Sequence, residues 1–254
     1  MADFNKHHNT AFIIQARLTS SRLPRKILLP FSLDGNTILD IIIEKLKYFS
    51  DCHIIVATSE SHQNDDLATY LSSKNVLFYR GSENDVLQRF IDTANHFNIQ
   101  NIIRICSDNP FLDASSIEKI LSVSNDSNAD YISFNINGTP SIKTHFGFWT
   151  EYVTLGALKK VAQLTNEQLY HEHVTNFIYT HPDLFKIEWI DVPKKIANAT
   201  DVRLTIDTIE DFENAQEIYN MVGKDHSVDY LMDFLSANQQ FLTRMHQQIE
   251  NNKK

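Results

Sequence analysis

The sequence predicts an α/β protein with a mostly parallel β-sheet and helices on both of its faces. Apolar runs of strand length alternate with segments whose apolar residues recur at helical spacing, as in successive βαβ units. This alternation favours a parallel sheet that is covered on both sides. The chain has 254 residues, of which 42% are hydrophobic and 22% charged, and these values suit one domain with a substantial core.

Residue spacing places the elements of the first half in order. Apolar residues stand three and four positions apart over 36–49, and those of 84–97 gather on one helical face. The polar segment 62–72 is also expected to be helical. Strands are expected at 11–16, 52–57, 76–79, 102–106 and 131–134, and helices at 36–49, 62–72, 84–97 and 115–124.

The pattern changes in the second half of the chain. The segment 138–147, which contains two glycines and a proline, predicts a loop or an irregular excursion. Thr208 with Asp211 three residues later is typical of a helix start and predicts a helix over 209–221. The other expected elements are helices near 152–164 and 168–180, strands near 185–192 and at 202–206, and a helical tail from 227.

The composition argues against several classes of protein. The chain has only six glycines, and none of them form G-x-G-x-x-G or G-x-x-x-x-G-K-[ST], so neither a Rossmann dinucleotide site nor a P-loop is expected. Side chains must then hold any bound phosphate. A net charge of −9 argues against a nucleic-acid polymer as a partner. Without a signal segment or an apolar run of ~20 residues, no membrane partner and a cytoplasmic location are expected.

A basic segment follows the first predicted strand. Four of the chain's 23 lysines and arginines fall within ten residues, and Ser20 adds a hydroxyl. The four are Arg17, Arg22, Arg25 and Lys26. In parallel sheets, ligands bind beyond the carboxyl ends of the strands, where this cluster could grip a polyphosphate. The alternative is a solvated basic loop.

Two aspartates follow short apolar runs at other predicted strand ends. Asp108 precedes Asn-Pro after one such run, and Asp207 ends another. A carboxylate in this position can hold Mg²⁺ through one or two oxygens while substrate phosphates supply others. The two aspartates could therefore meet across one metal ion. The alternative is that each is a turn or cap residue.

Taken in order, these segments resemble the cytidylyltransferase family that activates sugars. The family includes acylneuraminate and 3-deoxy-manno-octulosonate cytidylyltransferases, and the spore-coat polysaccharide protein F type is the branch that this chain resembles most. The family's opening motif, A-R-x-x-S-x-R-L-P-G-K, is similar to Ala16–Lys26. Further motifs match at Ala57–Ser59, Arg80–Phe90, Arg104–Phe111, Glu172–Thr175 and Arg203–Phe212.

The resemblance implies a fold and a reaction. The fold is GT-A-like, with one domain over 1–254, and the protein is usually a homodimer. The segment 138–200 is implied to be an excursion that serves acceptor binding and dimerisation. The reaction is Mg²⁺-dependent nucleotidyl transfer from CTP to a sugar or sugar acid, with pyrophosphate leaving, for polysaccharide or glycan synthesis. Alternatives are GTP or another nucleoside triphosphate acting on a sugar phosphate, a glycosyltransferase, and a non-catalytic nucleotide-sugar binding subunit.

The matching motifs also imply roles for individual residues. Triphosphate binding and catalysis are implied for Arg17, Arg22 and Lys26, assisted by Ser20, and metal binding and catalysis for Asp108 and Asp207. Further nucleotide contacts are implied at Ala16, Ala57, Ser59, Arg80 and Arg104. Acceptor contacts are implied at Glu151, Glu172 and His173.

Three departures from the family pattern bear on the expected site. Arg25 and Ser107 stand where the family has glycine, which permits a close backbone approach or a positive φ. These replacements predict a shifted triphosphate, an additional arginine contact or weakened activity. Residues 146–153 alter the usual G-x-x-x-E-V-F segment, where the family contacts the acceptor, so the identity of the acceptor stays open.

Overall fold

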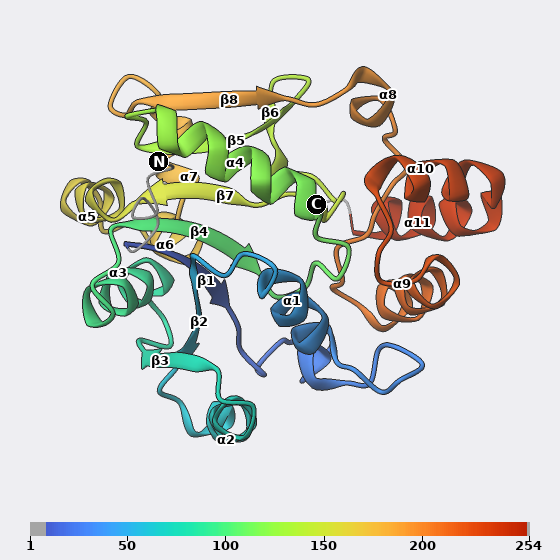
Figure 1. Ribbon diagram of the computed structural model, residues 1–254, viewed down its shortest axis with the longest axis horizontal. Coiled ribbons are helices and arrows are strands. Elements are labelled where there is room, and N and C mark those ends of the chain that lie inside the picture. The colour runs from blue at the N-terminus through green and yellow to red at the C-terminus, as the bar shows by residue number, and fades with distance from the viewer. Residues whose placement is uncertain (1–8, 253–254) are drawn as a thin grey trace.

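The computed structural model describes residues 9–252, and its centre is an eight-stranded sheet (Figure 1). The strands are β1 (Thr10–Gln15), β2 (His53–Ser59), β3 (Leu77–Gly81), β4 (Asn101–Cys106), β5 (Tyr131–Ile136), β6 (Thr139–Pro140), β7 (Glu151–Thr154) and β8 (Ile187–Asp191). Their order is β3-β2-β1-β4-β7-β5-β6, and β8 pairs with β5 beside this path.

Strands β6 and β7 run against the remaining strands. β1 is parallel to β2 and β4, β2 is parallel to β3, and β8 is parallel to β5. β7 is antiparallel to both β4 and β5, and β6 is antiparallel to β5. The predicted α/β fold with a mostly parallel sheet is confirmed. Because β1 and β4 are parallel neighbours, their carboxyl ends and the loops that follow meet at one edge.

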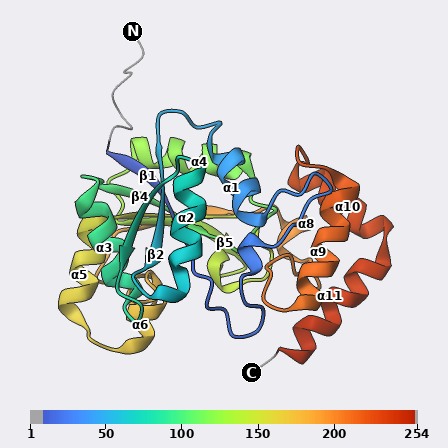
Figure 2. The ribbon, with the colours of Figure 1, turned by 90° about the horizontal axis from the view of Figure 1, so that it is seen from below.

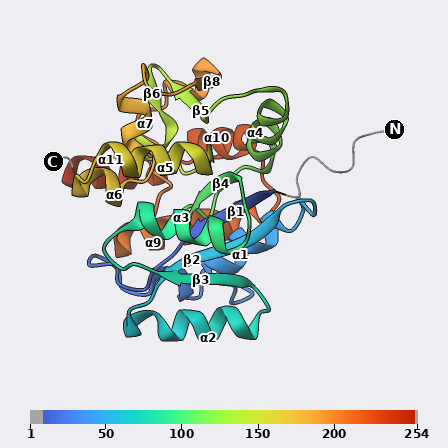
Figure 3. The ribbon, with the colours of Figure 1, turned by 90° about the vertical axis from the view of Figure 1, so that its left-hand side faces the viewer.

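Helices cover both faces of the sheet. Those of the first two thirds are α1 (Ile38–Leu46), α2 (Asp65–Ser73), α3 (Val86–His96), α4 (Ala114–Asp126), α5 (Leu155–Leu164), α6 (Gln168–Glu172) and α7 (Asn176–Thr180). Successive residues of β1 point to opposite faces, so Phe12 and Ile14 join one core and Ala11 and Ile13 the other. The first core includes α1 and α4, the second α3 and α5, and Figure 3 shows these pairs on opposite sides of the sheet.

The C-terminal helices gather at one end of the molecule (Figure 2). They are α9 (Ile209–Val222), α10 (Val228–Ala237) and α11 (Gln239–Asn251), which follow the short α8 (Lys194–Ala197). The expected start of α9 is a capping box, in which Thr208 and Asp211 each accept the other's backbone N–H. Phe212 packs edge-on against Phe31 with ring centroids 5.2 Å apart, which joins this end to the first core.

Two expected helices are shorter in the structure. The helix expected near 152–164 begins only at α5, because Val153 and its neighbours pair with β4 as strand β7. Thr154 then caps α5 by accepting the Ala157 amide. The helix expected near 168–180 is interrupted between α6 and α7, where His173 leaves the helical conformation.

The strand expected at 202–206 does not form in the described chain. Its amides donate instead to the carbonyls of His145 and Asp108, which lie in two different loops. The apolar run is therefore extended without a neighbouring strand to pair with. These bonds place Asp207 next to Asp108.

The segment 138–200 is part of the main sheet, to which it contributes β6, β7 and β8. Its role in a dimer stays a prediction. Within residues 9–252, no helix combines the length and the apolar character that crossing a membrane requires.

Candidate active site

A cavity of about 340 Å³ opens at the carboxyl ends of β1 and β4. Its walls come from the basic segment after β1, the turn after β4 and the end of the 202–207 stretch. The lining residues are Gln15, Arg17, Ser20, Ser21, Arg22, Lys26, Arg104, Cys106, Ser107, Asp108, His173 and Asp207. The structure thus brings together the six residues for which the motifs imply triphosphate or metal binding, namely Arg17, Ser20, Arg22, Lys26, Asp108 and Asp207.

Buried hydrogen bonds fix the basic loop, residues 17–26, to the protein interior. The Leu18 amide donates to Asn64 Oδ1 at 2.7 Å, and Asn64 Nδ2 donates to Ser59 Oγ at 2.7 Å. The Ala16 amide donates to the Ala57 carbonyl at 3.2 Å. Ala16, Ala57 and Ser59 therefore support the loop from inside the fold and do not line the cavity.

Two carboxylates flank one ammonium group in this cavity. Lys26 Nζ lies 3.4 Å from Asp108 Oδ2 and 3.7 Å from Asp207 Oδ1. Arg22 forms a further ion pair with Asp207 at 2.7 Å. The Ile206 amide donates to the Asp108 carbonyl at 3.1 Å, and Lys26 Nζ donates to the Ile206 carbonyl. The two aspartates, distant in sequence, thus lie within reach of one cation.

The donor set of this pair suits a hard divalent cation. Mg²⁺ prefers oxygen ligands and usually takes one or two carboxylates, with water and substrate phosphates completing its shell. Within residues 9–252, no three His, Cys, Asp or Glu side chains are grouped to hold a metal. Asp108 and Asp207 therefore fit Mg²⁺ that arrives with a nucleotide, and they do not make a closed site of protein ligands alone.

A buried arginine, Arg203, binds Asp207 from the interior of the protein. Arg203 Nη2 donates to Asp207 Oδ2 at 3.1 Å, and Arg203 Nε and Nη2 each donate to Asp211 at 2.8 Å. Arg203 Nη1 donates to His145 Nδ1 at 2.8 Å. Burial and the adjacent guanidinium lower the pKa of His145, which favours the neutral ring. Because a guanidinium can only donate, Nδ1 is the nitrogen that accepts.

Arg104 and Glu151 form a buried ion pair across β4 and β7. Arg104 Nη1 lies 2.7 Å from Glu151 Oε2, and Glu151 is 1% exposed. Thr175 Oγ1 donates to the same oxygen at 3.1 Å, and the Tyr131 hydroxyl donates to the other. Glu151, predicted to contact the acceptor, therefore lies behind Arg104 rather than at the cavity surface. Arg104 itself faces the cavity.

A second cavity of about 290 Å³ adjoins the first and shares Arg104 and His173 with it. Its lining residues are Arg104, Ile142, Lys143, Leu169, His173, Thr175, Asn176 and Tyr179. No acidic side chain is among them, and Lys143 forms no ion pair within the described chain. Glu172, the remaining predicted acceptor residue, is exposed and lines neither cavity.

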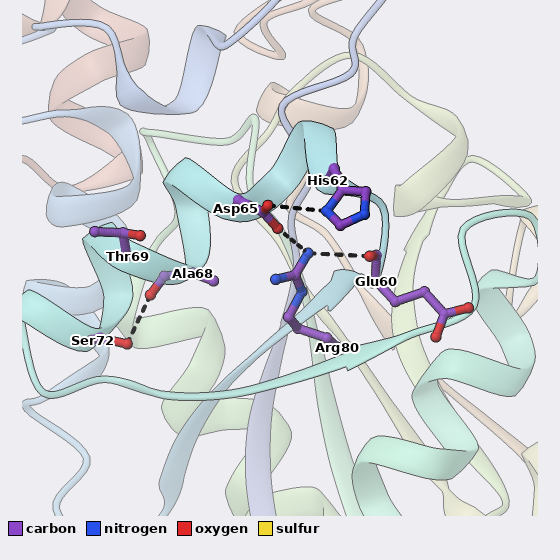
Figure 4. A pocket seen from close by; sticks show the side chains of 7 residues that line it. All are labelled: Glu60, His62, Asp65, Ala68, Thr69, Ser72 and Arg80. Atoms are coloured by element: carbon purple, nitrogen blue, oxygen red, sulfur yellow. Dashed lines mark hydrogen bonds and ion pairs between the residues drawn. The ribbon is translucent and has the colours of Figure 1, made fainter.

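Arg80 lies in a separate outer pocket, shown in Figure 4. This pocket of about 550 Å³ is lined by Glu60, His62, Asp65, Ala68, Thr69, Ser72 and Arg80. Arg80 Nη2 donates to Asp65 at 2.6 Å and to the Ser61 carbonyl at 3.0 Å. Its guanidinium therefore joins β3 to the start of α2 and does not line the 340 Å³ cavity.

The two residues that replace family glycines differ in their effect on the backbone. Arg25 has a φ of 61°, so the loop keeps the left-handed conformation that glycine readily adopts. Its guanidinium pairs with Asp66 at 2.8 Å on the exposed surface and lies outside the cavity. Ser107 lines the cavity without a positive φ. Arg25 therefore does not line this cavity, and an additional arginine contact with the triphosphate stays one of three alternatives.

Sequence reasoning missed several residues of the site. Asn64 and Lys143 lie in polar stretches with no motif that distinguishes them. Arg203 belongs to a matched motif, but its partner His145 is 58 residues away and carries no signal of its own. Gln15, at the end of the first strand, could have been found from its place just before the basic segment.

Comparison with known proteins identifies relatives over nearly the whole chain. The family model described as cytidylyltransferase matches residues 11–241. The chain is 33% identical over 235 residues to the spore coat polysaccharide biosynthesis protein SpsF of Bacillus subtilis strain 168, which covers 89% of this chain and 94% of that protein.

Two solved structures share the fold of this chain. A cytidylyltransferase from Leptospira borgpetersenii superimposes with a TM-score of 0.82 and 28% identity, over 93% of this chain and 97% of the other. A CMP:2-keto-3-deoxy-manno-octonic acid synthetase complexed with CTP has a TM-score of 0.63 and 13% identity, over 84% and 99% of the two chains. At that identity the second likeness concerns the fold alone.

Proposed function

Because the chain belongs to the cytidylyltransferase family and is an enzyme, we propose that it transfers the cytidylyl group of CTP to a sugar acid. Pyrophosphate leaves, and a CMP-activated sugar forms for a surface polysaccharide or glycan. One observation carries the proposal: a single cavity holds cations that suit a triphosphate beside two carboxylates that suit Mg²⁺. The family supports CTP as the nucleotide, and the relative in spore-coat polysaccharide biosynthesis supports a sugar acceptor.

Three cations on the triphosphate side of the cavity differ in their attachments. Arg17 pairs with no carboxylate of the described chain and is free to meet a phosphate. Arg22 and Lys26 pair with the aspartates and can turn toward an anionic ligand within the same cavity. Arginine binds two phosphate oxygens at once, and lysine adds a point charge. Together these residues neutralise the charge that builds as pyrophosphate leaves.

Asp108 and Asp207 are the residues that would hold Mg²⁺. When bound, the metal supplies Lewis-acid stabilisation of phosphate oxygens. Lys26 lies between both carboxylates and balances their charge. Ser59 and Ala57 contribute to triphosphate binding indirectly, by hydrogen bonds that hold the basic loop in place.

The second cavity suits the acceptor. An acceptor placed there would lie next to a triphosphate in the first cavity, because the two cavities share Arg104 and His173. The sugar hydroxyl oxygen then bonds to the α-phosphorus as the bond to pyrophosphate breaks, and the hydroxyl proton passes to solvent water. Lys143, His173 and Asn176 offer donors and no acid opposes them, so an anionic sugar fits this lining.

We also propose that the protein is a homodimer that associates through residues 138–200. Exposed apolar side chains of this segment that line neither cavity support that choice, namely those of Leu164, Leu184 and Trp189. Light scattering on purified protein should give twice the chain mass. A monomer at micromolar concentration would contradict the proposal.

The reaction is tested by pyrophosphate release with each of four nucleoside triphosphates, Mg²⁺ and a panel of sugar acids and sugar phosphates. Release with CTP and a sugar acid is expected. Release with GTP alone would overturn the cytidylyl assignment, and a sugar phosphate as sole acceptor would overturn the sugar acid. Silence across the panel would favour a non-catalytic binding subunit.

Variants then test the proposed metal ligands. Asp108→Ala and Asp207→Ala are each expected to lower the rate at least ~10²-fold, the scale of losing one major transition-state contact. Asp201→Ala is the matched control, since Asp201 is exposed and lines neither cavity. Near-normal turnover in Asp108→Ala or Asp207→Ala would remove that residue from the assignment.

A further inference from the structure

Asp207 has two arginine partners that differ in their freedom to move. Arg22 pairs with its Oδ1 at 2.7 Å from a side chain that is 51% exposed. Arg203 pairs with its Oδ2 at 3.1 Å from a side chain that is 1% exposed. Arg22 can swing to a phosphate, whereas Arg203 stays in place because its nitrogens also bind Asp211 and His145. Arg203 is therefore the partner that can orient Asp207 throughout a reaction.

His145 connects this buried arginine to the wall of the second cavity. It follows Lys143 in the chain by two residues, and its carbonyl accepts two amides of the 203–207 stretch, at 2.8 and 3.2 Å. Gly147, with a φ of 71°, approaches Leu204 so closely that a Cβ there would lie 3.2 Å from the Leu204 backbone. The wall segment and the stretch that carries Asp207 are thus packed as one unit.

We infer that Arg203 and His145 are positioning residues, which hold the Asp207 carboxylate in the orientation needed for metal binding and tie it to the wall that carries Lys143. The inference rests on the proposed nucleotidyl transfer. His145 acts through Arg203 and touches no reacting atom. Removing the acceptor at His145 lets the Arg203 guanidinium tilt, so that Asp207 binds metal more weakly while the protein stays folded.

The test compares His145→Ala with His145→Asn, whose Oδ1 can replace Nδ1 as the acceptor. Electron paramagnetic resonance of Mn²⁺ with CTP, recorded with and without the protein, reports the protein-bound metal without any turnover, since CTP alone also binds Mn²⁺. His145→Ala is expected to weaken Mn²⁺ binding about fivefold, the scale of one hydrogen bond, and His145→Asn is expected to restore it. His246→Ala is the control, because His246 pairs with Asp201 and lines neither cavity.

The outcomes separate this inference from the proposed function. Equal Mn²⁺ affinity in His145→Ala and the unaltered protein would overturn the inference. The inference would also be overturned if His145→Ala lowered Mn²⁺ affinity and Tm together and His145→Asn did not restore the affinity. The expected Mn²⁺ behaviour without pyrophosphate release from any acceptor would count against the proposed function alone. If the unaltered protein takes up no Mn²⁺ with CTP, both are wrong.

Discussion

Replacing Glu151 by alanine is expected to destabilise the protein by about 3–5 kcal/mol, the usual effect of removing one partner from a buried ion pair. The change leaves the Arg104 guanidinium without its counter-charge, at a position that is 8% exposed. It also removes the acceptor of the Tyr131 hydroxyl and of Thr175 Oγ1. Because each buried donor left unpaired adds to the loss, the upper part of that range is expected.

Urea unfolding followed by circular dichroism measures this change. For a chain of this size, each kcal/mol lowers Tm by about 2–4 °C, so a fall of roughly 6–20 °C is also expected. Glu151→Gln is the matched control, because the amide keeps the shape and one acceptor oxygen but not the charge. Replacing Arg104 and Glu151 together by leucine should recover much of the stability, since neither charge is then buried alone.

A loss below about 1 kcal/mol in Glu151→Ala would refute the reasoning, because that is the value of an exposed pair. Activity adds a second distinction. Arg104 lines both cavities, so Glu151→Gln should raise KM for nucleotide and acceptor alike. An effect on the acceptor alone would instead indicate a direct acceptor contact by Glu151.

Four further outcomes are expected. Arg25→Gly should leave turnover nearly unchanged, because the Arg25 guanidinium lies outside the cavity; a large loss of pyrophosphate release would contradict this. Gly147→Ala should cost about 1–3 kcal/mol in urea unfolding, since alanine is strained at a φ of 71°. Lys143→Met should raise KM for an anionic acceptor and leave that for CTP unchanged; equal shifts would place Lys143 elsewhere in the mechanism. Burial would raise the pKa of Asp211, but the bonds and charge of Arg203 lower it overall. The ionised Asp211 carboxylate therefore stabilises the folded protein above about pH 4. That stabilisation is lost as the pH falls through the lower folded-state pKa. Acid titration of Asp211→Asn should therefore show a shallower loss of stability below pH 4.

Elements that depend on neighbouring residues were predictable from the sequence. The helical spacing of 84–97 gave α3, and the Thr208–Asp211 pattern gave the capping box of α9. The strand predicted at 202–206 does not form, because a strand needs a neighbouring strand with an unpaired edge. A short apolar run gives no information about such a neighbour. Residues 151–154 show the opposite error: a helix was predicted to begin there, but the residues form strand β7 because β4 offers an edge to pair with.

The candidate site also combines residues that a local motif predicts with contacts that form only in the folded chain. The basic loop from Arg17 to Lys26 is one continuous motif, and its position after an apolar strand was sufficient to locate it. The burial of Glu151 behind Arg104 depends on two strands that pair only in the folded sheet. The contact between Arg203 and His145 depends on how two loops pack, which no local pattern encodes.

Arg22 and Lys26 pair with the two aspartates on which metal binding is proposed to depend, and this has a thermodynamic consequence. A nucleotide that draws these cations toward its phosphates uncovers the carboxylates. By reciprocity, a divalent ion on the carboxylates releases the cations for the phosphates. Each ligand should therefore increase the affinity for the other. Such positive cooperativity would make the protein a poor scavenger of free divalent ions and a selective receptor for the metal–nucleotide complex.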